Sequence, residues 1–138
     1  MGQPTWRELK TIEVPLSAGT AWTMALEYVK AGRVLRFSAS GKWQPEGVTS
    51  PIGADGDPLA PNAGSEFLDS APFGALIGRV GISSAAATST DYTFPIGRTA
   101  VLIVPPDKNG ALFLGVNDHS TRMGKVTGPL KVTISEAL

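Results

Sequence analysis

The sequence predicts an all-β protein, a two-sheet antiparallel β-sandwich, and three observations favour this class. The 138-residue chain contains 16 Gly and 11 Pro, which divide it into short pieces. Several pieces alternate strictly between apolar and polar residues, the pattern of a strand with one buried face and one wet face. No segment combines helical spacing of apolar residues with caps at both ends. We therefore expect a single domain over residues 1–138 with about seven or eight strands.

The first part of the chain predicts two strands and a turn. Residues 11–16 alternate, with the apolar side chains on one face, and residues 24–29 form a weaker strand. The segment 30–33, Lys-Ala-Gly-Arg, is typical of a tight reversal between strands. We expect residues 1–10 to form an N-terminal extension, in which Trp6 packs on the sheet or on a neighbouring subunit.

Four later segments also predict strands. Residues 35–39 and 130–135 alternate, so each should bury one face. Residues 75–82 and 99–104 are more uniformly apolar, which predicts central strands buried on both faces. Glycines inside the 75–82 segment, Gly78 among them, indicate a bulge or close sheet packing.

The remaining connections differ in length and composition. The turn at residues 106–110 contains Asn-Gly, a hairpin signal, and leads into a strand over 111–117. Residues 83–90 predict a loop or a single helical turn. Residues 44–72 are rich in Pro, Gly, Asp and Asn. Because loops of this length in a compact domain are usually functional or mobile, this is the first place to look for a site.

Composition excludes several classes of function. Lys+Arg and Asp+Glu are both 12, so the formal net charge is zero, and we expect no nucleic-acid or anionic-membrane partner. The chain has no Cys, which excludes disulfides, thiolate zinc sites and a cysteine nucleophile. No apolar run is long enough to span a membrane. The first residues lack the pattern of a signal peptide, and nothing in the sequence fixes the compartment.

Six short segments rich in Gly, Ala and aromatic residues follow one another along the chain. They are Ala21-Trp22-Thr23, Lys30-Ala31-Gly32, the segment 37–43 ending in Lys42-Trp43, the segment 73–81 beginning Phe73-Gly74-Ala75-Leu76, Phe94-Pro95-Ile96-Gly97, and the segment 110–118 ending in Asn117-Asp118. Their order and spacing resemble the LecA/PA-IL family of bacterial galactose-binding lectins over residues 11–134. The resemblance implies a jelly-roll or galactose-binding-domain-like sandwich, carbohydrate binding without catalysis, and association into homo-oligomers.

The resemblance also implies a position for calcium, which in these lectins bridges the protein and a galactose ring. Calcium takes six to eight oxygen ligands from carboxylates, amides and backbone carbonyls. Carried onto this chain, the carboxylate is Asp118, and the ligand loop is 119–127, closed by Gly128. A backbone carbonyl would come from near Gln44 or Pro45.

This chain departs from the family pattern inside that loop. Where the family has a pair of amide or acid side chains before Ser-Gly, this chain has Lys125-Val126 before Thr127-Gly128. A lysine brings a positive charge and a valine brings no oxygen, so we expect calcium binding to be weakened by orders of magnitude. The hypothesis that follows is that the Lys125 ammonium stands near the ion position and pairs with Asp118. Tight calcium binding in a calorimetric titration would contradict it.

Asn117 and Asp118 are the first candidate ligand-binding residues. They either hydrogen-bond to sugar hydroxyls or make a local Asx turn. His119, the single histidine, is expected on an exposed loop beside a ligand. A Ser-His-Asp triad is not supported, because no Gly-x-Ser-x-Gly elbow is present and Asp118 is adjacent to His119 in the sequence. We therefore expect no enzyme activity.

Other candidates belong to the segment that enters the long loop. Trp43 ends a strand there, and its ring either stacks on a sugar or packs in the core, whereas Trp22 is expected to fill the core or an end of the sandwich. Asp55 and Asp57 resemble a fragment of an acidic calcium loop and lie where related lectins approach the sugar, but an Asp-Gly turn explains them as well. Asp69 is a weaker candidate.

Together these patterns predict a carbohydrate-binding module with its site at one end of the sandwich, between segments 44–72 and 117–128. The alternative is a structural or assembly protein that keeps a lectin-like fold and has lost the sugar site. Binding of a glycan separates the two.

Overall fold

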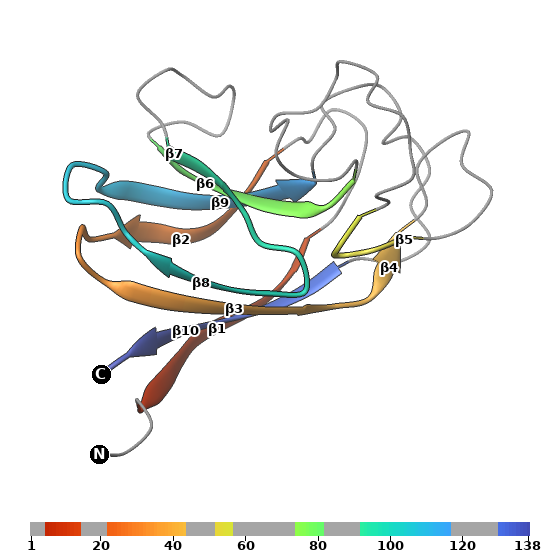
Figure 1. Cartoon of the computed structure of the whole chain (residues 1–138), viewed down its shortest axis with the longest axis horizontal. Coiled ribbons are helices and arrows are strands. Elements are labelled where there is room, and N and C mark those ends of the chain that lie inside the picture. Colours follow the sequence, from red (N-terminus) through yellow and green to blue (C-terminus); the bar gives the residue numbers. More distant parts are fainter. Residues whose placement is uncertain (1–4, 15–21, 44–51, 57–73, 82–91, 117–129) are drawn as a thin grey trace.

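The computed structural model describes residues 5–14, 22–43, 52–56, 74–81, 92–116 and 130–138, and within these ranges the protein is all-β. Two antiparallel four-stranded sheets lie face to face (Figure 1), as the sequence predicts. None of the described residues belongs to a helix long and apolar enough to cross a membrane.

The first sheet has the order β1-β10-β3-β8, and the second has the order β2-β9-β6-β7. The strands of the first sheet are β1 (Trp6–Val14), β10 (Leu130–Ala137), β3 (Val34–Ser40) and β8 (Thr99–Ile103). Those of the second are β2 (Thr23–Val29), β9 (Gly110–Val116), β6 (Leu76–Gly81) and β7 (Tyr92–Pro95). A two-stranded ladder joins β4 (Lys42–Trp43) to β5 (Ile52–Gly53).

Apart from the β4–β5 ladder and the adjacent pair β6–β7, each strand along the chain lies in the opposite sheet from the one before it. This alternation, with two four-stranded sheets, is the jelly-roll arrangement. It has a consequence for function, because connections that cross between the sheets must gather at the two ends of the sandwich.

The core lies between the sheets and follows the alternation of the strands. Leu35 and Phe37 of β3, Leu112 and Leu114 of β9 and Ile134 of β10 are at most 2% exposed. Burying each such side chain contributes about 1.5–3 kcal/mol of transfer free energy. The inward-facing residues of both sheets therefore hold the layers together.

Strand β6 is buried on both faces, which confirms the expectation for residues 75–81, the described part of the predicted strand 75–82. Leu76 points into the inter-sheet core, while Ile77 belongs to a second buried cluster with Trp22 and Phe113. Arg79 lies on the same outward side, with its guanidinium carbon 4.8 Å from the Trp22 ring centre and 4.6 Å from that of Phe113. Trp22 is therefore a core residue, as the sequence indicated.

Strand β8 corrects the second expectation of a doubly buried strand. It is an edge strand of the first sheet, and Val101 and Ile103 are 60% and 66% exposed on its outer face. Only Leu102 among its large side chains points into the core. Uniform apolar character therefore did not indicate burial on both sides here.

The expected N-terminal extension is also corrected. Residues 6–10 are the first half of β1, which pairs along its length with β10. The register shifts between Glu8 and Lys10, and this irregularity interrupts the alternation that would otherwise reveal a strand. Trp6 packs on the sheet beneath Arg36, whose guanidinium carbon lies 4.5 Å from its ring centre.

The two expected turns have different outcomes. The reversal at 30–33 is present, with the Arg33 amide donating to the Lys30 carbonyl at 3.2 Å. The turn before Gly110 does not close a hairpin, because β8 and β9 belong to different sheets. Asn109 instead joins this turn to the reversal at 30–33, since its side-chain oxygen accepts a 2.6 Å hydrogen bond from the Ala31 amide.

Some expectations fall on residues that are not described, including the whole of 83–90 and most of 44–72. Within the latter range, β5 forms a short ladder with β4 that the sequence did not indicate. Strand β7 was not predicted either, because it is four residues long and ends in a proline.

Gly78 provides a test of the packing around β6. The β6–β9 register is continuous through Gly78, so the glycine marks close packing rather than a bulge. A Cβ at this position would lie 2.5 Å from Cζ of Phe94 and 3.1 Å from Cδ1 of Ile96. We predict that Gly78→Ala lowers the free energy of unfolding by about 1–3 kcal/mol in denaturant titrations, as overpacking does.

Gly53→Ala is the matched control, because the nearest atom to its new Cβ would be the Gly41 carbonyl oxygen at 3.8 Å, an ordinary contact. An equal loss of stability in both variants would contradict the close packing of Phe94 on Gly78.

Candidate functional site

Most of the residues that the sequence singled out lie outside the described part of the chain. These are Asn117, Asp118, His119, Lys125 and Asp57. The ligand roles expected for them, and the calcium position built on Asp118, stay predictions. Asp55 and the backbone of Trp43 are described, and they show where this end of the sandwich lies. Whether the Trp43 ring stacks on a sugar or packs in the core stays a prediction.

The backbone places three segments at the same end of the sandwich: the β4–β5 ladder, the turn that carries Asp55 and the end of β9. Trp43 pairs with Ile52 in the β4–β5 ladder, and Asp55 follows directly in the next turn. Strand β9 ends at Val116, the last described residue before Asn117, and Val116 pairs with Leu76 at the start of β6. The amide of Leu76 donates to the Ala54 carbonyl at 2.7 Å, so the end of β9 lies close to the turn that carries Asp55.

A hollow of about 480 Å³ opens at this end of the sandwich, and we call it the end hollow. Its described lining comes from the segment that joins the end of β3 to β4, from the end of β5 and the turn after it, and from the turn between β7 and β8. These residues are Ala39, Ser40, Gly41, Lys42, Gly53, Ala54, Asp55 and Arg98. The size is within the range of small-molecule sites.

Asp55 and Arg98 form the polar centre of the end hollow. One carboxylate oxygen of Asp55 accepts a 2.8 Å hydrogen bond from the Arg98 amide, and the other accepts a 2.6 Å bond from Arg98 Nε. The side chains of Arg98 and Asp55 are 75% and 56% exposed. An ion pair this exposed contributes little to stability, about 0–1 kcal/mol, so its main effect is to fix the orientation of both groups.

The backbone of Leu76 holds the two turns that carry this pair. Its carbonyl accepts hydrogen bonds from the amides of Ile96 and Gly97, both at 3.0 Å, next to Arg98. Its amide is bound to the carbonyl of Ala54, next to Asp55. Leu76 itself is fully buried, which anchors both turns to the core.

The turn around Asp55 has the geometry expected from its Asp-Gly sequence. The Gly56 amide donates to the Gly53 carbonyl at 3.1 Å, which closes a four-residue turn. The turn interpretation is therefore confirmed for Asp55, and the turn also presents the carboxylate to the end hollow.

The chemistry available at the end hollow is that of hydrogen bonding. A carboxylate oxygen has two lone pairs, so Asp55 keeps acceptor capacity beyond its bonds to Arg98. The guanidinium of Arg98, the Lys42 ammonium and the Ser40 hydroxyl supply donors on exposed side chains. No group of three His, Asp or Glu side chains with metal-binding geometry occurs within the described ranges. The described lining includes one carboxylate, which a guanidinium already engages, and this set does not make a calcium site.

Sequence reasoning did not find Arg98. It lies 43 residues from Asp55, and no local pattern connects them. The available signal was Gly97, which ends the Phe94–Gly97 segment and indicates a turn that could present the next side chain.

Comparison with known proteins supports the fold. No protein-family model matches the sequence, and no curated protein matches it. Among solved structures, the chain is similar to one described as the N-terminal domain of EclA, a PllA-like lectin, with a TM-score of 0.66 and 19% sequence identity. The match covers 94% of this chain and 97% of that one. The protein therefore has a lectin-like β-sandwich fold.

The contact between Gly97 and Asp55 can be tested by a double-mutant cycle. Gly97 has φ +66°, and a Cβ there would lie 2.7 Å from Asp55 Oδ1. Gly32 has a similar φ of +86° with nothing within 4 Å of its Cβ position, so Gly32→Ala reports backbone strain alone. We predict that Gly97→Ala costs about 1 kcal/mol more than Gly32→Ala in chemical unfolding, because Asp55 must give up hydrogen bonds.

In an Asp55→Ala background the extra cost of Gly97→Ala should disappear, since the obstructing oxygen is gone. If the extra loss of unfolding free energy persists in that background, the Asp55 carboxylate is not the group that excludes a Cβ at Gly97.

Proposed function

We propose that this chain is a carbohydrate-binding, lectin-like module that binds sugar at the end hollow, and that it is not an enzyme. The observation that carries the proposal is the position of the oriented Asp55–Arg98 pair at an end of a lectin-like sandwich. Polar side chains fixed in a hollow give orientation and specificity to a bound small molecule.

The donor and acceptor pattern of the end hollow suits a sugar. Each sugar hydroxyl donates one hydrogen bond and accepts others, as any hydroxyl does. A carboxylate beside a guanidinium offers an acceptor and a donor to neighbouring hydroxyls at the same time. Because Asp55 and Arg98 already hold each other at 2.6 Å, little side-chain entropy remains to be lost when a ligand binds.

The proposal also includes the ligand-binding residues that the sequence predicts outside the described ranges. Asn117 and Asp118 follow the end of β9, whose last described residue, Val116, pairs with Leu76. We propose that they hydrogen-bond to the same sugar, with His119 and the Trp43 ring as neighbours. A galactose-type sugar is the first ligand to test, and Lys125 is proposed to replace calcium beside Asp118.

A second candidate function is assembly through a lectin-like fold without sugar binding. The observation that favours it is the exposure of Val101 and Ile103 on the outer face of edge strand β8. Exposed apolar side chains on an edge strand favour pairing with another chain. Size-exclusion chromatography with light scattering tests this candidate, because a strict monomer would contradict it.

The proposed function is tested by calorimetric titration with galactose and galactose-terminated oligosaccharides, in calcium and in chelator. We predict binding that does not require calcium and that Asp55→Asn weakens about 10-fold or more, because a charged acceptor is lost. Asp107→Asn is the matched control, since it removes an exposed carboxylate from a turn outside the end hollow.

If no glycan binds in calcium or in chelator, the lectin proposal fails and assembly becomes the favoured function. If Asp55→Asn binds as tightly as the unaltered protein, the end hollow is not the site.

A further inference from the structure

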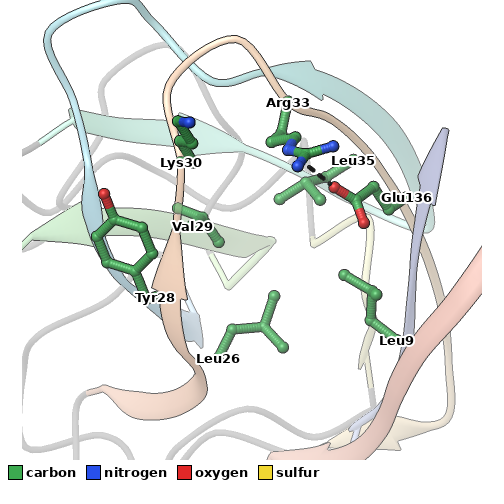
Figure 2. A pocket seen from close by; sticks show the side chains of 8 residues that line it. All are labelled: Leu9, Leu26, Tyr28, Val29, Lys30, Arg33, Leu35 and Glu136. Carbon is green, nitrogen blue, oxygen red and sulfur yellow. Dashed lines mark ion pairs between the residues drawn. The ribbon is translucent and has the colours of Figure 1, made fainter. Parts of the chain in front are cut away.

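A second hollow, of about 500 Å³, lies away from the sugar site, and we call it the edge hollow. Arg33, which precedes β3, lines it, whereas Ser40 at the other end of β3 lines the end hollow, so the two are at opposite ends of that strand. Its described lining is Leu9, Leu26, Tyr28, Val29, Lys30, Arg33, Leu35 and Glu136 (Figure 2).

The edge hollow exists because the two strands that flank it are irregular. Strand β1 is the edge of the first sheet, and β2 is the edge of the second. The register of β1 shifts at Leu9, and that of β2 shifts on both sides of Leu26. Such irregularities bend a strand and redirect side chains, and they are frequent beside functional sites. In Figure 2 Leu9 and Leu26 point toward one another from the two strands.

The floor and walls of the edge hollow are apolar. Val29 and Leu35 are 5% and 2% exposed and form its base. Above them, Leu9 and Tyr28 are 37% and 61% exposed, although both are large apolar side chains. Two exposed apolar side chains gathered at a concave surface favour a ligand with an apolar body.

The upper rim carries an excess of positive charge. Glu136, with a side chain 10% exposed, accepts an ion pair from Arg7 at 2.9 Å and another from Arg33 at 3.3 Å. The Glu136 carboxylate is thus shared by two guanidinium groups, of which that of Arg33 lines the hollow. Lys30 adds a third cation, and its ammonium forms no ion pair with any residue in the described ranges. Among the residues that line the hollow, Lys30 and Arg33 are positive and Glu136 is negative, which leaves a net charge of +1 at this rim.

The Arg33 guanidinium contacts Glu136 through one of its three nitrogens only. Its ion pair with Glu136 runs through Nε, and no other ion pair joins Arg33 to the described residues. Its two terminal nitrogens are therefore available to an anion, and Arg33 is 58% exposed. A guanidinium whose Nε faces one carboxylate still presents its two terminal nitrogens side by side, the geometry that a second carboxylate accepts.

From this geometry we propose that the edge hollow binds a small monoanion with an apolar body, an apolar carboxylate. The body lies against Leu26, Val29 and Leu35 with the Tyr28 ring as one wall. The carboxylate faces Lys30 and the terminal nitrogens of Arg33. This site is independent of the sugar site and can hold its ligand whether or not the end hollow binds a glycan.

The test uses naphthalene-2-carboxylate as the probe and 2-naphthylmethanol as its neutral analogue, titrated into isotopically labelled protein by NMR. We predict saturable shifts of the amides of residues 26–33, 9 and 136 with the carboxylate, and weaker binding of the alcohol. Lys30→Gln should weaken binding of the carboxylate about two- to five-fold and leave the alcohol unchanged, as expected for an exposed charge pair.

Two variants complete the design. Tyr28→Ser removes an exposed wall, so the fold should persist, and it should weaken both probes because both use the apolar surface. Lys131→Gln is the matched control, since it removes an exposed lysine that does not line the edge hollow. Absence of saturable shifts at these amides overturns the proposal. Equal binding of acid and alcohol, or equal effects of Lys30→Gln and Lys131→Gln, overturns its anionic part.

Discussion

The backbone of Leu76 is the point on which the candidate sugar site depends. Its amide and carbonyl together make three hydrogen bonds to the turns that carry Asp55 and Arg98, at 2.7–3.0 Å. Because the Leu76 side chain is fully buried, these bonds connect an exposed ion pair directly to the core. A site on turns is usually less precise than a site on strands, and here the first residue of a buried strand supplies the missing precision.

The jelly-roll topology explains why two hollows with different chemistry occur in the described part of the chain. Most connections cross from one sheet to the other, so they gather at the ends, where polar side chains such as Asp55 meet solvent. The edge hollow has another origin, the irregular edge strands β1 and β2, and it exposes part of the apolar interior. The first arrangement suits a hydroxyl-rich ligand, and the second suits an apolar ligand with one charge.

The strands that alternate strictly could be predicted from the sequence, as could the sandwich they form, because period-two alternation is a direct consequence of a half-buried strand. The start of β1 could not, since its register shift at Leu9 breaks the alternation. The exposed face of β8 was also hidden, because an apolar run does not reveal whether a strand is central or at an edge. Local turn signals such as Asn109-Gly110 cannot tell which sheet the next strand joins.

Local sequence patterns also could not reveal which residues meet at the candidate site. Asp55 could be singled out because Asp-Gly indicates a turn, but its partner Arg98 is brought to it only by the bonds to Leu76. The resemblance to galactose-binding lectins agrees with the fold that structural comparison supports. The roles that it implies for Asn117, Asp118 and Lys125 stay predictions, because those residues lie outside the described ranges.

The most direct test of the account is to map where a sugar binds. In an NMR titration with a galactose-terminated oligosaccharide, we expect the amides of Gly56, Gly97 and Arg98 to shift saturably, since they flank the Asp55–Arg98 pair. The amide of Gly32, in the turn before β3 at the opposite end of that strand, should not move. Saturable shifts at Gly32 without shifts at Gly97 and Arg98 would contradict the placement of the sugar site at the end hollow.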